Sequence, residues 1–98
     1  MDIEYFVERI TSAAEVTKIY VYGEKYSSTD GSLREASFCV VTPSDPKEVE
    51  KKLYLEIDAD FPFNLLVYSE RRWAFFTSDK TSYAHSISQK GRLIYGEP

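Results

Sequence analysis

The chain has 98 residues, enough for one domain with a single modest core, and a formal net charge of −4. Its 43% hydrophobic and 15% aromatic residues exclude intrinsic disorder, and its negative charge argues against a dedicated nucleic-acid binder. No apolar run approaches the roughly 18 residues of a membrane-spanning helix, and acidic residues stand where a signal peptide would be basic. A single cysteine and a single histidine argue against a disulfide and a zinc site. We therefore expect one cytoplasmic domain over residues 1–98, without membrane or nucleic-acid partners.

The first half of the chain predicts a helix followed by two strands. Asp2 is a helix N-cap, and the apolar residues after it recur at helical spacing. Residues 18–22 form a β-rich run that we expect to end at Gly23. The polar residues 24–34 predict a loop with room for one helical turn, and residues 36–42 predict the second strand.

The second half predicts three helices and two more strands. Asp45 followed by Pro46 is a typical helix start, and residues 61–68 predict a third strand with Pro62 near its beginning. Ser69 caps a short helix, and another helix runs over residues 81–90 and closes at Gly91, ahead of a last strand at 92–95. The order α-β-β-α-β-α-α-β predicts an α/β (α+β) fold, a small mixed sheet with helices packed on it.

Four residues on three predicted strands stand out together. Gly23 is expected to end the first strand, Glu35 and Ser37 lie two apart on the second, and Asn64 lies within the third. In its segments KIYVYGEKYSSTDGSLREASFCVVT, FPFNLLVYSERRWAFF and KGRLIYGE the chain resembles the minimal nucleotidyltransferases of the DNA polymerase β-like family. In that family a strand delivers a Gly-Ser pair, a second strand opens with Asp-x-Asp, and a later strand supplies a third Asp. The resemblance extends from about residue 15 to residue 97 and implies a nucleotidyltransferase-like fold.

The resemblance also implies where the family's chemistry would lie, and there the chain departs from it. The family's two Mg²⁺ ions lie about 4 Å apart and clamp the attacking and leaving oxygens of a nucleoside triphosphate. The three aspartate positions hold Glu35, Ser37 and Asn64, so that one carboxylate remains, and the serine of the Gly-Ser pair is replaced by Glu24. Ser37 is a poor Mg²⁺ ligand, and Asn64 carries no charge and cannot act as a general base. The sequence therefore predicts vestigial catalytic and nucleotide-binding positions, with no intact metal site and no cofactor.

Three functions follow as hypotheses. The first is a pseudoenzyme that binds a protein partner or itself, as the antitoxin-like half of a two-component toxin–antitoxin pair or as a dimer. The second is an active transferase in which Glu35, Asp30 and a rearranged loop hold one Mg²⁺ and move a nucleoside monophosphate to a protein or small molecule. The third is a module that senses a nucleotide without turnover. The first is favoured because three functional groups are missing at once.

Other chemistry-bearing residues have simpler structural interpretations. We expect Asp58 and Asp60 to lie in a solvated loop rather than in a metal pair, and Asp30 to form an Asx turn with Gly31. The remaining expectations are a helical His85 without a catalytic partner, an inert core Cys39 and a solvated Arg71-Arg72 pair beside a buried Trp73 and Phe76. The tyrosines at positions 20, 22, 26 and 68 either surround the vestigial cleft or simply occupy half-buried strand faces, which suit tyrosine.

Overall fold

The computed structural model describes residues 2–98, which form a four-stranded mixed sheet with four helices. In chain order the elements are α1 (Ile3–Ala13), β1 (Lys18–Tyr26), β2 (Leu33–Thr42), α2 (Pro46–Glu56), β3 (Phe63–Ser69), α3 (Glu70–Thr77), α4 (Tyr83–Lys90) and β4 (Arg92–Tyr95). The predicted fold class and element order are confirmed.

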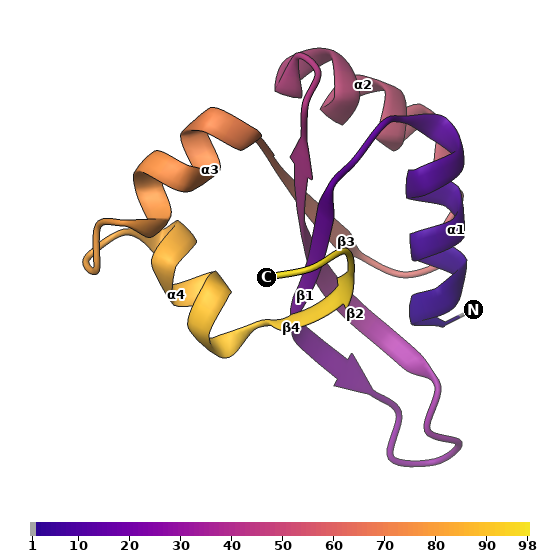
Figure 1. Cartoon of the computed structure of the whole chain (residues 1–98). Coiled ribbons are helices and arrows are strands. Elements are labelled where there is room, and N and C mark those ends of the chain that lie inside the picture. The colour runs from indigo at the N-terminus through magenta and orange to yellow at the C-terminus, as the bar shows by residue number, and fades with distance from the viewer. Residues whose placement is uncertain (1) are drawn as a thin grey trace.

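The sheet has the strand order β3-β2-β1-β4. β1 pairs antiparallel with both β2 and β4, whereas β2 and β3 are parallel. Helices α1 and α2 cover one side of the sheet, and α3 and α4 lie on the other side (Figure 1). The chain between the parallel strands β2 and β3 contains α2, as a parallel crossover requires.

The predicted helix starts are confirmed by capping hydrogen bonds. The side chains of Asp2, Asp45 and Ser69 each accept a hydrogen bond from a backbone N–H in the first turn of the helix that follows. The last helix begins slightly later than predicted, at Tyr83, because Ser82 rather than an earlier residue provides its cap. These short polar side chains satisfy N–H groups that have no partner within the helix.

Gly23 does not end β1, and the prediction of a strand end there was wrong. The strand continues to Tyr26, and the register with β2 shifts between Tyr22 and Lys25, where Gly23 adopts a φ of +61°. One extra residue in β1 at this point forms a β-bulge, a position that favours glycine because a Cβ is strained at positive φ. Residues 24–34 therefore belong to a hairpin and not to a loop with a helical turn.

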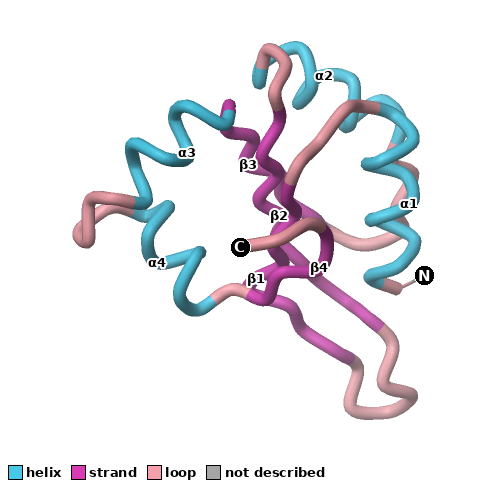
Figure 2. Tube along the Cα trace, in the orientation of Figure 1, coloured by secondary structure: helices cyan, strands magenta, loops and turns pink. Residues whose placement is uncertain are grey.

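The hairpin turns at Asp30 and Gly31. The Asp30 carboxylate accepts hydrogen bonds from the Ser32 N–H at 2.9 Å and the Ser32 hydroxyl at 2.7 Å, and Gly31 has a φ of +74°. This confirms the predicted Asx turn at the tip of an arm that projects past both helix layers (Figure 2). The arm contributes to an exposed surface of 6,199 Å², above the roughly 5,700 Å² expected for a chain of this mass.

β3 begins at Phe63 rather than at residue 61, so that Pro62 precedes the strand. β3 lies at the end of the sheet, and α2 partly covers its free edge. There the Tyr54 hydroxyl accepts a hydrogen bond from the Leu65 N–H at 3.1 Å. An N–H that bonds to a helix side chain is unavailable to a further strand, so this contact protects an exposed sheet edge.

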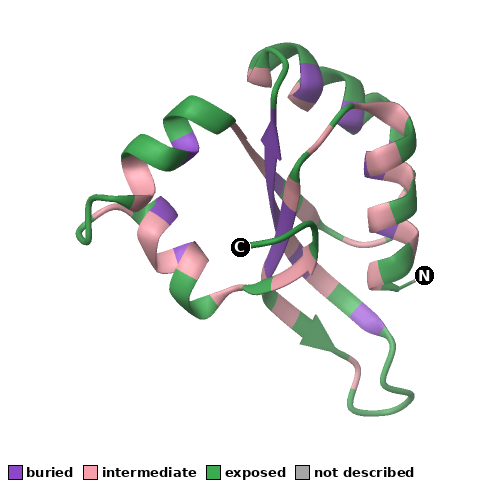
Figure 3. Ribbon diagram, viewed as in Figure 1, coloured by how far each residue is buried: buried purple, intermediate pink, exposed green. Residues whose placement is uncertain are grey.

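Buried residues lie on helices on both sides of the sheet (Figure 3), and the larger cluster of buried apolar residues is on the α1/α2 side. There Phe6, Ile10, Phe38 and Leu53 are fully buried, and the rings of Phe6 and Phe38 stack at 4.4 Å. On the α3/α4 side a smaller cluster surrounds Trp73, and several of its members are only partly buried (Tyr22, Leu66, Tyr68, Phe76 and Leu93). None of the helices within residues 2–98 has both the length and the apolar character needed to cross a membrane.

Candidate functional site

The sheet brings three of the five motif positions next to one another. Ser37 of β2 is the register partner of Asn64 in the parallel strand β3, and register partners lie about 4.8 Å apart with side chains on the same face. A Cβ at Gly23 in β1 would lie 4.0 Å from the Ser37 hydroxyl oxygen. The hydroxyl and the carboxamide share the α3/α4 side of the sheet, beyond the Trp73 cluster, and Asn64 is exposed. We call these three residues, together with Glu35 of β2, the motif patch.

Glu35, which lies in β2 like Ser37, provides the carboxylate of the motif patch. It precedes Ser37 by two residues, so that the pleat of the strand directs both toward the same side of the sheet. Its carboxylate lies 3.4 Å from the ammonium of Lys25, its register partner in β1, and both side chains are well exposed. The single anionic group of the patch is therefore already paired with a cation of the chain itself.

Glu24 is paired as well. Its carboxylate lies 3.3 Å from the guanidinium of Arg92 at the start of β4, with 23% of the Glu24 side chain exposed. In the resembled family this position would approach a triphosphate. Here the bulge at Gly23 keeps Glu24 within a continuous strand, where it links β1 to β4.

The residues of the motif patch do not fit the two-magnesium group that the family resemblance implies. Mg²⁺ is held in proteins by carboxylates together with substrate phosphates, and the patch offers one paired carboxylate, one hydroxyl and one carboxamide. Within residues 2–98, no three Asp, Glu, His or Cys side chains lie close enough to hold a metal ion together. Ser37 and Asn64 can donate and accept hydrogen bonds, but neither side chain is a general base at neutral pH.

The acidic residues outside the strands have structural roles. At the hairpin tip, the hydroxyl and then the N–H of Ser32 lower the pKa of Asp30, which lies outside the motif patch. Asp58 acts through its main chain, since its carbonyl accepts a hydrogen bond from the Tyr5 hydroxyl at 2.9 Å. Asp58 and Asp60 are exposed in the segment between α2 and β3, as predicted.

His85 and Cys39 also have structural positions. The Nδ1 atom of His85 lies 2.9 Å from the Thr77 carbonyl oxygen, which indicates that Nδ1 carries the proton and joins α4 to the end of α3. Cys39 is fully buried in β2, and burial raises the pKa of its thiol to about 12. Because thiolates are the reactive form, this cysteine is inert at neutral pH.

Three of the four tyrosines considered from the sequence gather under α3 and α4, and the fourth does not. Tyr20 and Tyr68 each pack 5.4 Å from the Trp73 ring, and Tyr22 lies beside Ser37 as its register partner in β1. Tyr26 lies on the projecting hairpin and is 50% exposed, so its placement at the cleft was wrong. A further tyrosine on this side of the sheet is Tyr83 of α4, whose ring lies 6.0 Å from the ring of Tyr22. Its position in the sequence gave no sign of this contact.

The arginine pair lies as predicted from helical spacing. Trp73 is buried against the sheet, whereas Arg71 and Arg72 are exposed. The guanidinium carbon of Arg72 lies 5.8 Å from the centre of the Phe76 ring one turn later, a cation–π distance.

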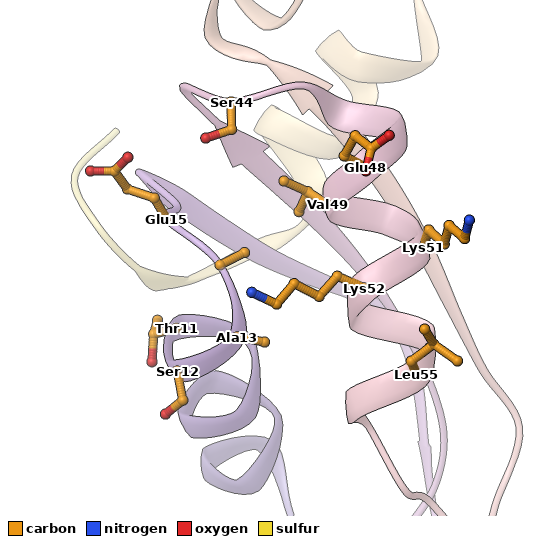
Figure 4. A pocket seen from close by; sticks show the side chains of 11 residues that line it. Thr11, Ser12, Ala13, Glu15, Ser44, Glu48, Val49, Lys51, Lys52 and Leu55 are labelled. Atoms are coloured by element: carbon orange, nitrogen blue, oxygen red, sulfur yellow. The ribbon is translucent and has the colours of Figure 1, made fainter.

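A large surface depression lies away from the motif patch. It is a shallow groove of about 810 Å³ between the end of α1 and the outer side of α2. Lys52 extends toward α1 over it, whereas Glu15, Glu48 and Lys51 point apart (Figure 4). Since its charged groups do not converge, this groove offers no catalytic arrangement.

Comparison with protein-family models, with curated proteins and with solved structures gives no match. The resemblance to nucleotidyltransferases therefore stays a prediction from the residues quoted above.

Proposed function

We propose that this chain is a noncatalytic, cytoplasmic nucleotidyltransferase-like domain that acts by binding another protein. The observation that supports this proposal is the motif patch, where the register of β2 and β3 sets Ser37 beside Asn64 and leaves Glu35 paired with Lys25. The positions that would hold metal in the resembled family thus lie together without the necessary charge.

Electrostatics explains why the loss of carboxylates matters. Two Mg²⁺ ions about 4 Å apart repel by roughly 17 kcal/mol at an effective dielectric of 20, which is a scale and not a net energy. Carboxylates and substrate phosphates offset this repulsion in a two-metal site. Here Glu35 would have to leave Lys25 before it could contribute at all.

Exposed aromatic and aliphatic side chains support protein contact. Phe75 and Tyr83 are 70% and 60% exposed on the α3/α4 side, and Leu55 of α2 is 80% exposed. Large apolar residues of this kind are concentrated in the centres of protein interfaces. In a two-component system of toxin–antitoxin type, a domain without catalysis would act on its helical partner through such contacts, as a stoichiometric neutraliser. Self-association is the simpler form of the same behaviour.

Thermal unfolding with nucleotides tests the noncatalytic part of the proposal. We expect the melting temperature to be unchanged by Mg²⁺ with ATP or GTP. A ligand at a hundred times its Kd would stabilise the folded state by about 2.7 kcal/mol. A shift without product would indicate nucleotide sensing, and transfer of a labelled nucleotide to an acceptor would show an active transferase. Either result would overturn the proposal.

Restoring the carboxylates tests the placement of the motif patch. The double variant Ser37→Asp, Asn64→Asp sets two carboxylates on neighbouring strands near Glu35, and we expect it to bind Mg²⁺ or Mn²⁺ in calorimetry, unlike the natural chain. Adding Glu35→Gln to this variant is the matched control and should weaken the binding. If the double variant takes up no metal, the side chains do not converge as described.

A further inference from the structure

A second depression, of about 420 Å³, lies on the α3/α4 side where the two helices meet β3. The rings of Tyr68, Phe76 and Tyr83 line it, and the first two are 6.2 Å apart. Its volume falls in the range of roughly 300–1,000 Å³ that is usual for small binding pockets. We call it the α3–α4 pocket. It has room for an apolar side chain against these aromatic rings.

A cation without an anionic partner lines the same pocket. Arg72 is exposed there, and its guanidinium lies over the Phe76 ring. The ion pairs formed within residues 2–98 involve Arg9, Lys25 and Arg92, but neither Arg72 nor its neighbour Arg71. The guanidinium presents a planar set of N–H donors that matches a carboxylate.

The net charge differs between the two parts of the chain, and most of the residues that line this pocket belong to the positively charged part. Residues 61–98, which form β3, α3, α4 and β4, carry five Lys or Arg and three Asp or Glu, a net charge of +2. Residues 1–60 carry seven and thirteen, a net charge of −6. An anionic segment is therefore attracted to the α3/α4 side and repelled from the rest of the molecule.

We propose that the α3–α4 pocket binds an acidic peptide segment of a partner protein, with an aromatic or aliphatic side chain against the rings and a flanking carboxylate on Arg72. This proposal rests on the proposed function and names the chemistry of the partner. Phe75 is 70% exposed, and its ring lies 5.2 Å from that of Phe76, so it extends the apolar contact beyond the pocket. Arginine and aromatic residues of this kind carry much of the binding energy in protein interfaces.

NMR titration of the whole chain tests the proposal. The probe is the peptide acetyl-Asp-Asp-Phe-Asp-Asp-amide, and the comparison peptides replace its phenylalanine by alanine or its aspartates by lysines. We expect the probe alone to shift amide signals around Tyr68, Arg72, Phe76 and Tyr83. Arg72→Gln should weaken binding about fivefold, the upper range for an exposed ion pair, and higher salt should weaken it further.

Lys80→Gln is the matched control, because it removes the same charge from the loop between α3 and α4 and Lys80 does not line the pocket. It should change the affinity by less than Arg72→Gln, and Tyr83→Ala should weaken binding without unfolding the chain. Equal weakening by both charge variants, equal binding of the lysine peptide, or no shift at the pocket would overturn the proposal.

The same samples separate this result from the proposed function. Addition of Mg²⁺ and ATP should leave the signals of Ser37 and Asn64 in place. Shifts of these signals would show nucleotide binding at the motif patch and would overturn the proposed function, whatever the peptide does. If only the peptide fails to bind, the pocket proposal alone is overturned.

Discussion

The two sides of the sheet differ in composition and in burial. Against α1 and α2, Phe6 and Phe38 stack in a closed apolar cluster from which water is excluded. Against α3 and α4, Tyr20 is buried beside Trp73, whereas Tyr22 and Tyr68 stay partly accessible, and the motif patch continues that side of the sheet. A closed apolar layer contributes most of the stability, whereas an aromatic layer with hydroxyl groups and open pockets is suited to recognition. The difference indicates that the α1/α2 side holds the fold, and the function that we propose uses the α3/α4 side.

The strongest test of this comparison removes one ring from each side. Phe38→Ala should lower the free energy of unfolding by about 3–5 kcal/mol, because it leaves a cavity in a fully buried cluster. Tyr68→Ala should cost less, because that ring is only partly buried. Urea denaturation of both variants measures the difference. Equal losses would contradict a division between a structural side and a recognition side.

The pH dependence of stability is the next largest effect, and it belongs to the α3/α4 side. Burial raises the pKa of Tyr20, Tyr22 and Tyr68, and for Tyr22 the neighbouring Tyr83 adds to the effect of burial. Since unfolded tyrosines ionise near pH 10, the unfolded state loses these protons first. The stabilisation is therefore complete below about pH 10 and declines as pH rises toward the folded-state values, by up to about 1.4 kcal/mol per pH unit for each group.

Denaturation between pH 8 and pH 11 measures this decline together with that of the buried Cys39 thiol, whose raised pKa acts in the same direction from about pH 8.5. Tyr22→Phe should make it shallower, because phenylalanine has no proton to lose. An unchanged slope in that variant would show that Tyr22 does not contribute.

A smaller effect is expected from the bulge that shapes the edge of the motif patch. Gly23→Ala should lower the free energy of unfolding by about 1 kcal/mol, because alanine is strained at a φ of +61°. The added Cβ meets no steric clash, since the nearest atom, the Ser37 hydroxyl oxygen, is 4.0 Å away. Gly31→Ala at the hairpin tip, with a φ of +74° and open space around it, is a control for backbone strain alone. Thermal denaturation of both variants should give similar losses, and a neutral Gly23→Ala would contradict the bulge.

The smallest expected effect concerns the contact by which α2 protects β3. Tyr54→Phe removes the acceptor of the Leu65 N–H and should cost about 0.5–1 kcal/mol, the range for one exchanged hydrogen bond. Hydrogen exchange at Leu65 should become faster, while exchange in β2 should stay as it is. No change at Leu65 would show that the hydroxyl does not protect this edge.

Local signals predicted most of the fold. The caps at Asp2, Asp45 and Ser69 and the apolar periodicity of the helices depend on residues within one turn of each other, and the structure has them as predicted. The hairpin was missed, although the Asp30-Gly31 pair between two β-rich runs is a recognised hairpin signal. Gly23 was misinterpreted because glycine ends strands and also forms bulges, and only the pairing of β1 with β2 distinguishes the two.

The candidate site was predicted in part. The sequence alone determined which chemical groups are present, since side-chain identity fixes charge: one carboxylate, one hydroxyl and one carboxamide at the three aspartate positions of the resembled family. Only the tertiary structure decided which of them meet, because strand register joins residues far apart in the chain, as it joins Ser37 to Asn64 and Glu35 to Lys25. The same holds for Tyr83, which reaches Tyr22 through the packing of α4 on the sheet, a long-range contact that no local pattern encodes.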